Sequence, residues 1–283
     1  MIEFGKLSVV GTPIGNFSDF SPRGLETLQN ADLIACEDTR VSAKLLGKFG
    51  IKKPLLSYYK PKEQEKSKKI IELLLEGKNI ALISDAGMPC ISDPGYILVK
   101  KCYENGIVVE AIPGCSAAVS AVAVSGIDAA RFVFEGFLPV GKKERAERLD
   151  EIKSLSHAIV FYEAPHKLKQ TLSDLTEFFG GERNAAICRE LTKLHEETIR
   201  GTLGELSRYY TENEPRGEYV IVVEGKAREK EKLSLCDAVK IAREMIGSGE
   251  KPNAACKQAA ELSGISKREI YGALLEDRFD ETN

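Results

Sequence analysis

The chain has 283 residues, of which 43% are hydrophobic and 29% are charged, and its net charge is −3. This balance excludes an intrinsically disordered chain, and the negative charge disfavours a protein that binds nucleic acid through bulk positive charge alone. No apolar run is long enough to span a bilayer, and the N-terminus has no signal-peptide pattern, so we expect a cytoplasmic protein with no membrane contact. Seven scattered cysteines without a CxxC pair, and three histidines without metal-ligand spacing, predict reduced thiols and no metal site.

The first 115 residues alternate short apolar strands with helices. Ser21 followed by Pro22 is the pattern of a helix start, with serine as N-cap and proline at the first helical position. Apolar runs bounded by Gly, Pro and Asp predict strands at 7–11, 32–36, 53–59, 79–84 and 108–114. The segments between them have helical periodicity and predict helices at 21–30, 39–50, 63–78 and 94–106.

The next 110 residues continue this alternation after a helix of small residues at 116–126. Strands are predicted at 131–139, 157–163, 185–190 and 217–225, and helices at 166–180 and 202–213. A charged patch, VGKKERAERLDEIK, follows the first of these strands. Strands that alternate with helices predict βα units in mainly parallel sheets.

The C-terminal part changes pattern. A charged linker, KAREKEK, is followed by three helical segments at 233–249, 253–264 and 266–276. The spacing of Ala260, Gly264 and Ile270 is that of a helix-turn-helix, although a three-helix cap with no ligand fits almost as well. We therefore expect two α/β domains, residues 1–115 and 116–225, and a small all-α domain, residues 226–283.

Four loops stand out because each follows a predicted strand and is rich in Gly, Pro and small polar residues. Glycine lets a ligand approach the backbone closely, and proline fixes the loop before binding. Such loops suit a folded, mostly neutral ligand held by main-chain groups. The chain has no GxGxxG, P-loop or GxSxG pattern, so a dinucleotide, a P-loop nucleotide or a serine-hydrolase site is not supported. The loops are GTPIGN (11–16), SDAGMPCISDPG (84–95), IPGCSAA (112–118) and FYEAPH (161–166).

These loops, together with ADLIACEDTR (31–40), EGFLP (135–139) and RELTKLHEE (189–197), closely resemble one family. It comprises bacterial methyltransferases of the tetrapyrrole-methylase superfamily that modify the ribose 2′-oxygen of a cytidine in the decoding centre of 16S ribosomal RNA. The resemblance covers nearly the whole chain. It implies S-adenosylmethionine bound between the two α/β domains, a homodimer, and a substrate within the small ribosomal subunit. Two positions depart from the usual motifs: Lys167 replaces a common arginine, and Cys115 replaces a common proline.

The resemblance implies the cofactor contacts, whereas the catalytic and RNA-binding candidates are our hypothesis from the charged residues of the motifs and of two basic segments. Lys193 or Arg40 would stabilise the developing oxyanion or contact an RNA phosphate, and Glu163 or Asp38 would accept or orient the proton. An ion-pair network between the domains explains these charges equally well. The cofactor would contact Pro13, Asp85, Ala86, Gly87, Ser116, Ala117, Tyr162 and Leu191. RNA phosphates would be bound by Lys142, Lys143, Arg145, Arg148, Lys267 and Arg268.

Two alternatives remain open from the sequence. The first is a methyltransferase of the same fold that acts on a tetrapyrrole or another small molecule. The second is a non-catalytic, nucleic-acid-binding ligand sensor. The helical tail and the EDTR and RELTK motifs favour the RNA enzyme, because a small-molecule enzyme has no evident need for them.

Overall fold

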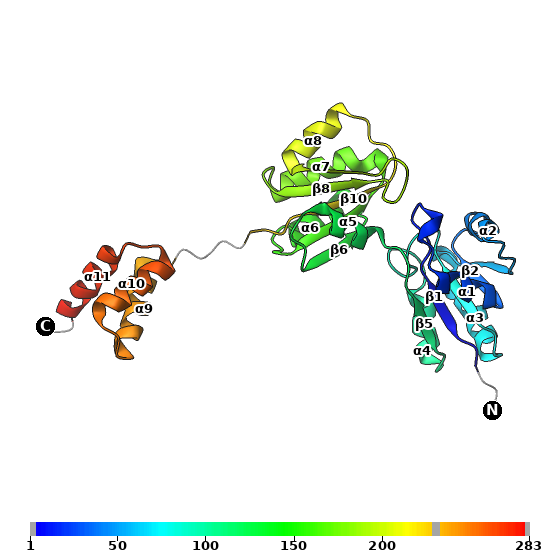
Figure 1. Cartoon of the computed structure of the whole chain (residues 1–283), viewed down its shortest axis with the longest axis horizontal. Coiled ribbons are helices and arrows are strands. Elements are labelled where there is room, and N and C mark those ends of the chain that lie inside the picture. Colours follow the sequence, from blue (N-terminus) through cyan, green and yellow to red (C-terminus); the bar gives the residue numbers. More distant parts are fainter. Residues whose placement is uncertain (1–3, 228–232, 281–283) are drawn as a thin grey trace. The chain divides into compact units, whose positions relative to one another are not determined.

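The structure is a computed structural model that describes the backbone of residues 4–227 and 233–280 (Figure 1) and the side chains up to residue 275. The chain divides into two compact units, Met1–Lys226 and Ala227–Asn283. Residues 228–232 of the predicted linker, and the last three residues of the predicted helical domain, lie outside the described residues.

The first sheet is wholly parallel, with strand order β3-β2-β4-β1-β5. Its strands are β1 (Leu7–Val10), β2 (Leu33–Cys36), β3 (Leu55–Ser57), β4 (Ile80–Ile83) and β5 (Val109–Ile112). Both faces are covered by helices, which explains why the inner strands β1, β2 and β4 are short, mainly apolar and largely buried. The helical elements are η1 (Phe17–Asp19), α1 (Pro22–Asn30), α2 (Thr39–Lys48), η2 (Lys60–Lys62), α3 (Glu63–Leu75) and α4 (Tyr96–Glu104).

Side-chain alternation along the strands decides which helices cover which face. Leu7 and Val9 of β1 pack in one cluster with residues of α3 and α4, whereas Val10 packs in another with residues of α1 and α2. The predicted start of α1 is confirmed, because the Ser21 hydroxyl accepts the Gly24 N–H at 3.0 Å and Pro22 is the first helical residue.

The second sheet has the order β6-β7-β10-β8-β9. Its elements are α5 (Ala117–Ser125), β6 (Phe132–Gly136), α6 (Lys142–Ile152), β7 (Ala158–Glu163), α7 (Pro165–Phe179), β8 (Asn184–Arg189), β9 (Glu197–Thr202), α8 (Leu203–Glu212) and β10 (Tyr219–Val223). Only β6 and β7 are parallel here; β10 runs antiparallel to β7 and β8, and β9 runs antiparallel to β8. Across the described residues of both sheets, five of the eight neighbouring strand pairs are parallel, so the α/β class is confirmed.

The expectation that this second sheet would also be mainly parallel was wrong, and β9 explains why. The sequence ETIRGT is polar and lies at the sheet edge, so it lacks the apolar alternation that marks a strand. Because β8 and β9 form a hairpin, the chain reverses without a crossover helix, and β10 then inserts between β7 and β8 in the antiparallel direction.

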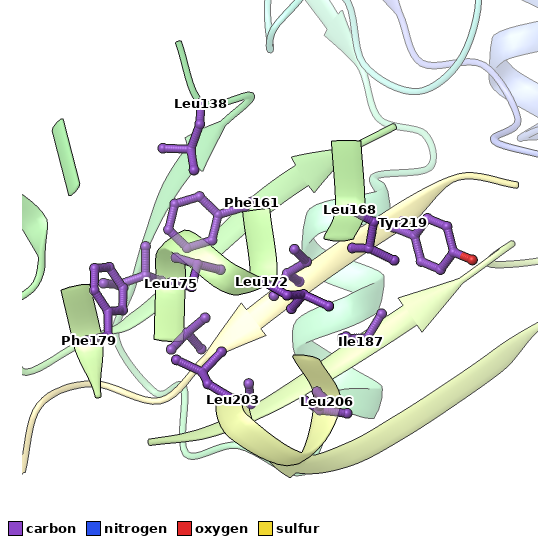
Figure 2. Close-up of a cluster of buried hydrophobic side chains, with 14 of the residues drawn as sticks. Leu138, Phe161, Leu168, Leu172, Leu175, Phe179, Ile187, Leu203, Leu206 and Tyr219 are labelled. Carbon is purple, nitrogen blue, oxygen red and sulfur yellow. The ribbon is translucent and has the colours of Figure 1, made fainter. Parts of the chain in front are cut away.

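The second sheet buries its two faces differently. One face packs against α6, α7 and α8 in a large apolar cluster that includes Phe161, Leu172 and Leu206 (Figure 2). The other face packs against the small residues of α5, such as Ala118 and Ala121. These small side chains allow a close approach between the helix and the sheet.

The C-terminal unit contains α9 (Leu235–Gly247), α10 (Pro252–Ser263) and α11 (Lys267–Asp280) (Figure 1). Each overlaps its predicted segment, but α10 begins one residue earlier and α11 ends four residues later than predicted. Its core consists largely of alanines with Cys256 and Ile270. Gly264 ends α10 in the left-handed conformation, with φ of 72°, which glycine adopts without steric cost. Within residues 4–227 and 233–280, no helix combines the length and the apolar character needed to cross a membrane.

Candidate active site

A cavity of about 570 Å³ lies where the carboxyl ends of β1 and β4 face the second sheet. Its size lies within the range of small-molecule sites, and its wall mixes apolar side chains with a few polar and charged ones. It is lined by Ile14, Asp85, Ala86, Gly87, Met88, Ile91, Ser92, Asp93, Ser116, Ala117, Phe137, Tyr162, Ala164, Pro165, His166, Cys188, Leu191, Glu218, Tyr219 and Val220.

The loops after β1 and β4 are joined by backbone hydrogen bonds at the floor of the cavity. The N–H of Thr12 donates to the carbonyl of Gly87 at 2.9 Å, and the N–H of Gly87 donates to the carbonyl of Thr12 at 3.1 Å. Gly11 and Gly114 touch through their backbones, since a Cβ on either residue would lie 2.6–2.7 Å from backbone atoms of the other. Glycine is therefore required where the ends of β1 and β5 meet.

Carboxylates form the polar wall. Burial raises the pKa of Asp93, and the charge of Asp85 raises it further. Burial also raises the pKa of Asp85, whose Oδ1 accepts the backbone N–H of Asp38 at 3.2 Å. Glu37 is a third carboxyl group with a raised pKa, first through burial and then through the charges of Asp93 and Asp85. Such a group of desolvated, mutually repelling carboxylates marks a candidate site for a cation or for proton transfer.

Tyr162 anchors the apolar wall. Its hydroxyl oxygen accepts the N–H of Ala118, near the start of α5, at 3.1 Å. Burial raises the pKa of Tyr162, so the phenol stays neutral and keeps this contact. Its ring meets the rings of Phe134 and Phe137 at steep angles, with centroids 4.9 and 5.7 Å away.

A strained loop carries Leu191 into the cavity. Glu190 and Thr192, on either side of it, have positive φ of 50° and 67°, a conformation that costs about 1–3 kcal/mol per non-glycine residue and is retained where the surroundings require it. Lys193 Nζ bonds the carboxylates of Glu190 and Glu218, each at 2.8 Å. Lys193 thus secures the loop that presents Leu191, and through Glu218 it reaches the cavity wall.

The structure brings most of the predicted cofactor-binding residues together. Seven of the eight line this one cavity: Asp85, Ala86, Gly87, Ser116, Ala117, Tyr162 and Leu191. Pro13 is buried beneath its loop, and its neighbour Ile14 contributes to the wall instead. The contact of each residue with a cofactor stays a prediction.

The predicted catalytic carboxylates do not line the cavity. Glu163 is buried and accepts hydrogen bonds from the Thr171 hydroxyl on α7 and from a neighbouring backbone N–H. Asp38 accepts the Arg40 backbone N–H at 2.8 Å as N-cap of α2, and its carboxylate pairs with the Arg40 guanidinium at 2.6 Å. These hydrogen bonds lower the pKa of Asp38 to about 2, which makes it a weak proton acceptor.

Two arginines of the predicted RNA-binding patch form ion pairs within the second α/β domain. Arg145 Nε lies 2.6 Å from Asp174, and both side chains are largely buried between α6 and α7. Arg148 contacts the buried carboxylate of Glu135 at 2.6 Å and Glu151 at 2.7 Å. These acidic partners largely neutralise the charges of the two arginines. Nothing in the sequence indicated this pairing.

The lysines of the predicted RNA-binding set lie on surfaces. Lys142 and Lys143 are exposed at the start of α6, where Lys143 makes only a loose ion pair with Glu147 at 3.8 Å. Lys267 and Arg268 are exposed in the first turn of α11. These four side chains are accessible to phosphate.

Sequence reasoning missed several residues of the site. Asp93 lies in the same 84–95 loop as Asp85, and the presence of a second carboxylate in that loop was a usable signal. Phe137 and Ile91 gave no signal, because exposed apolar residues cannot be recognised without the fold. Among the described residues, no group of three His, Cys, Asp or Glu side chains is placed to hold a metal ion.

Two five-stranded sheets within one compact unit, with a cavity that both line, define an α/β protein with a small-molecule site, and the comparisons with known proteins identify its class as a methyltransferase. A family model described as Tetrapyrrole (Corrin/Porphyrin) Methylases matches residues 6–207. The chain is 50% identical over 222 residues to ribosomal RNA small subunit methyltransferase I of Thermotoga maritima, covering 78% of this chain and 99% of that protein. Its identity to the proteins of the same name is 44% in Halalkalibacterium halodurans (94% and 93% covered) and 43% in Bacillus subtilis (96% and 94% covered). The chain therefore belongs to the tetrapyrrole methylase family, in the group named ribosomal RNA small subunit methyltransferase I.

Solved structures support the fold. The methyltransferase CobJ aligns with a TM-score of 0.61 at 19% identity and covers 80% of this chain and 96% of its own. A diphthine synthase aligns with a TM-score of 0.60 at 16% identity and covers 78% of this chain and 90% of its own. At these identities the likeness concerns the fold alone.

Proposed function

We propose that this chain transfers the methyl group of S-adenosylmethionine to the ribose 2′-oxygen of a cytidine in the decoding centre of 16S ribosomal RNA. As a methylase of this family, the chain is an S-adenosylmethionine-dependent methyltransferase. The observation that carries the proposal is the cavity, which gathers seven residues predicted to bind this cofactor. The names of the relatives at 40–50% identity support ribosomal RNA as the substrate.

The wall of the cavity fits an amphipathic, partly cationic cofactor. Leu191, Val220 and Tyr162 provide an apolar surface for a purine ring. Asp85 provides negative charge for the cationic groups of the cofactor. At Gly87, φ is 78°, a backbone conformation that strains any residue with a Cβ, whereas the neighbours of an added Cβ, at 3.5 Å, would be at ordinary contact distance. When bound, the cofactor supplies a methyl group already activated for displacement.

The chain has two tasks in this reaction: it aligns the ribose hydroxyl and it removes the hydroxyl proton. Alignment alone can contribute roughly 7–11 kcal/mol to lowering the barrier. We propose that the Asp93 carboxylate accepts the proton of the ribose hydroxyl. Asp85 accepts the Asp38 N–H, and Glu218 pairs with Lys193. Burial and the charge of Asp85 raise the pKa of Asp93 despite a hydrogen bond from Ser84 that lowers it, and a raised pKa makes this carboxylate a better proton acceptor.

Charged side chains around the cavity are candidate contacts for the RNA backbone. Lys193 is held beside the cavity by Glu190 and Glu218, and Arg40 is exposed next to the loop of Asp85. We propose that both contact phosphates near the target nucleotide. Lys142, Lys143, Lys267 and Arg268 would contact phosphates farther along the RNA.

We also propose that the chain acts as a homodimer in the cytoplasm, where ribosomal subunits are found. One face of α5 packs on the second sheet, and its other face exposes Val119 and Val124. Sedimentation equilibrium of the wild type and of Val119→Asp tests this proposal. We expect the wild type to be a dimer and the variant to shift toward monomer. A monomeric wild type would contradict the proposal.

The experiment that tests the function is transfer of labelled methyl to unmethylated small ribosomal subunits, to naked 16S RNA and to a tetrapyrrole, with mass spectrometry of the products. We expect 2′-O-methylcytidine from the ribosomal substrate. Asp93→Asn should abolish transfer and retain cofactor binding, whereas Glu76→Gln, an exposed carboxyl at the end of α3, should leave both unchanged. Full activity of the Asp93 variant would remove it as the proton acceptor.

The tetrapyrrole substrate serves a second candidate function. The family model, and solved neighbours such as a uroporphyrin-III-C-methyltransferase of Thermus thermophilus with a TM-score of 0.53, come from small-molecule methylases. Methylation of the tetrapyrrole and not of RNA would leave the fold and the cofactor as proposed and change the substrate.

A further inference from the structure

Phe137 is an aromatic side chain in an unusual position. It lines the cavity, and 60% of its surface is exposed, whereas Tyr219, an aromatic residue that lines the same cavity, is buried. It belongs to the EGFLP segment, to which neither the cofactor nor the proton transfer assigns a role. An exposed aromatic ring at the mouth of a catalytic cavity is a candidate ligand contact.

The local backbone directs this side chain outward. The pairing of β6 with β7 shifts register between Phe134 and Gly136, and Gly136 has a φ of 65°. Such an irregularity changes the direction of the side chain that follows it. Ser92 Oγ would lie 3.2 Å from a Cβ on Gly136, so a glycine both permits the conformation and leaves room for the neighbouring loop.

The ring of Tyr162 supports Phe137 from its edge and does not stack on it. Tyr162 meets it at 64° with a centroid distance of 5.7 Å, and Tyr162 is itself held by the Ala118 N–H. Because the Phe137 ring is supported and most of it remains exposed, little conformational entropy would be lost when a flat ligand stacks on it.

Ile91, from the other α/β domain, lines the same cavity and is 49% exposed. Its two neighbours, Cys90 and Ser92, both have positive φ, 69° and 70°. Strained residues on each side of an exposed apolar side chain indicate that its position is imposed by the fold, as at ligand-binding loops. The proximity of Ser92 to Gly136 places the Ile91 loop next to the Phe137 segment.

We propose that Phe137 is a stacking platform for the base of the nucleotide to be methylated, with Ile91 as an apolar contact for the same base. This inference rests on the proposed function, because it takes a nucleotide of RNA as the substrate. A base inside a folded RNA cannot bring its ribose to the cavity, so the nucleotide must leave its stack and needs a substitute partner. Stacking on an aromatic side chain provides one without selecting the base, and the carboxylates remain free to act on the ribose.

The test compares Phe137→Ala with Phe137→Trp, Ile91→Ala and the control Phe132→Ala, which removes a ring at the opposite end of β6. Phe137→Ala should raise KM for the ribosomal substrate, or its Kd, roughly 5- to 150-fold, the equivalent of one stacked base, and Ile91→Ala should raise it less. The cofactor Kd, measured by calorimetry, should stay within about twofold of wild type. Phe137→Trp should restore the substrate KM, and Phe132→Ala should change neither quantity.

A second measurement uses a 16S RNA fragment whose target nucleotide lacks its base. Loss of the base should weaken RNA binding to the wild type. It should reduce the RNA affinity of Phe137→Ala much less, because the substitution has already removed the contact with the base. If removal of the base weakens RNA binding equally in the wild type and in Phe137→Ala, the inference is overturned. It is also overturned if Phe137→Ala has the same substrate KM as the wild type or binds the cofactor more weakly. Failure of the wild type to methylate RNA would instead contradict the proposed function.

Discussion

Replacing Gly114 with alanine should destabilise the protein and weaken cofactor binding together. A Cβ at this position would lie 2.6–2.7 Å from the backbone of Gly11, a distance that real Cβ atoms essentially never show. The atoms in the way are the carbonyl and Cα of a residue at the end of β1, so no flexible side chain can move aside. The two strand ends must separate instead.

The cost follows from overpacking. Inserting one methyl group into a close-packed site typically destabilises a protein by about 1–3 kcal/mol. The φ of Gly114 is ordinary, so the contact accounts for the whole effect. Gly47→Ala is the matched control: Gly47 is exposed within α2, a Cβ there meets nothing within 4 Å, and alanine should stabilise the helix by about 0.5–1 kcal/mol.

Urea unfolding of the wild type and both variants measures the two shifts, and calorimetry measures the cofactor Kd. We expect the midpoint to fall for Gly114→Ala and to rise for Gly47→Ala. Cofactor affinity should fall only for the first, because separated strand ends displace the loops that carry Ile14 and Ser116. Unchanged stability and affinity of Gly114→Ala would refute the argument from backbone contact.

Three further predictions address other parts of the molecule. Burial raises the pKa of Asp93 above its ordinary value of 3.8, so the ionised form of this side chain is disfavoured in the folded state. Asp93→Asn should therefore raise the free energy of unfolding at pH 7. The difference between variant and wild type should vanish below pH 3.8, where Asp93 is protonated in both the folded and the unfolded protein. Glu63→Ala should lower the urea midpoint by the equivalent of about 1–3 kcal/mol, since the buried Glu63 carboxylate accepts the N–H of Gly95 at 2.8 Å and secures the end of the Asp93 loop; an unchanged midpoint would contradict this. Replacing Lys267 and Arg268 by alanine should weaken RNA binding and leave the cofactor Kd unchanged. In filter-binding titrations, the salt dependence of RNA binding should fall by up to two released counterions. An unchanged salt dependence would exclude both side chains as phosphate contacts.

The first α/β domain and the helical tail could be read closely from the sequence because their signals are local. The inner strands β1 and β4 are short, mainly apolar runs that are buried along their whole length, and α1 begins at a serine cap followed by proline. The four Gly- and Pro-rich loops were recognised for the same reason, and the three strand-end loops of the first α/β domain lie at the carboxyl edge of one parallel sheet.

Strand direction and the destination of charged side chains required the tertiary structure. Nothing local distinguishes a βα unit from the β8–β9 hairpin, since a polar edge strand shows little alternation. Neighbouring residues of β7 point to opposite faces of the sheet, so Tyr162 reaches the cavity while Glu163 turns toward α7 and bonds Thr171. Both belong to one motif, and only one can line the cavity.

The sequence by itself determined the chemistry that the loops offer, because glycine, proline and carboxylates act through local conformation and charge. The tertiary structure decided which of these groups meet. It brought Asp85 and Asp93 together with Leu191 and Phe137, residues far apart in the chain, because the two sheets present them to one cavity. It also paired Arg145 and Arg148 with buried acids, a result of packing between α6, α7 and β6 that residue spacing does not encode.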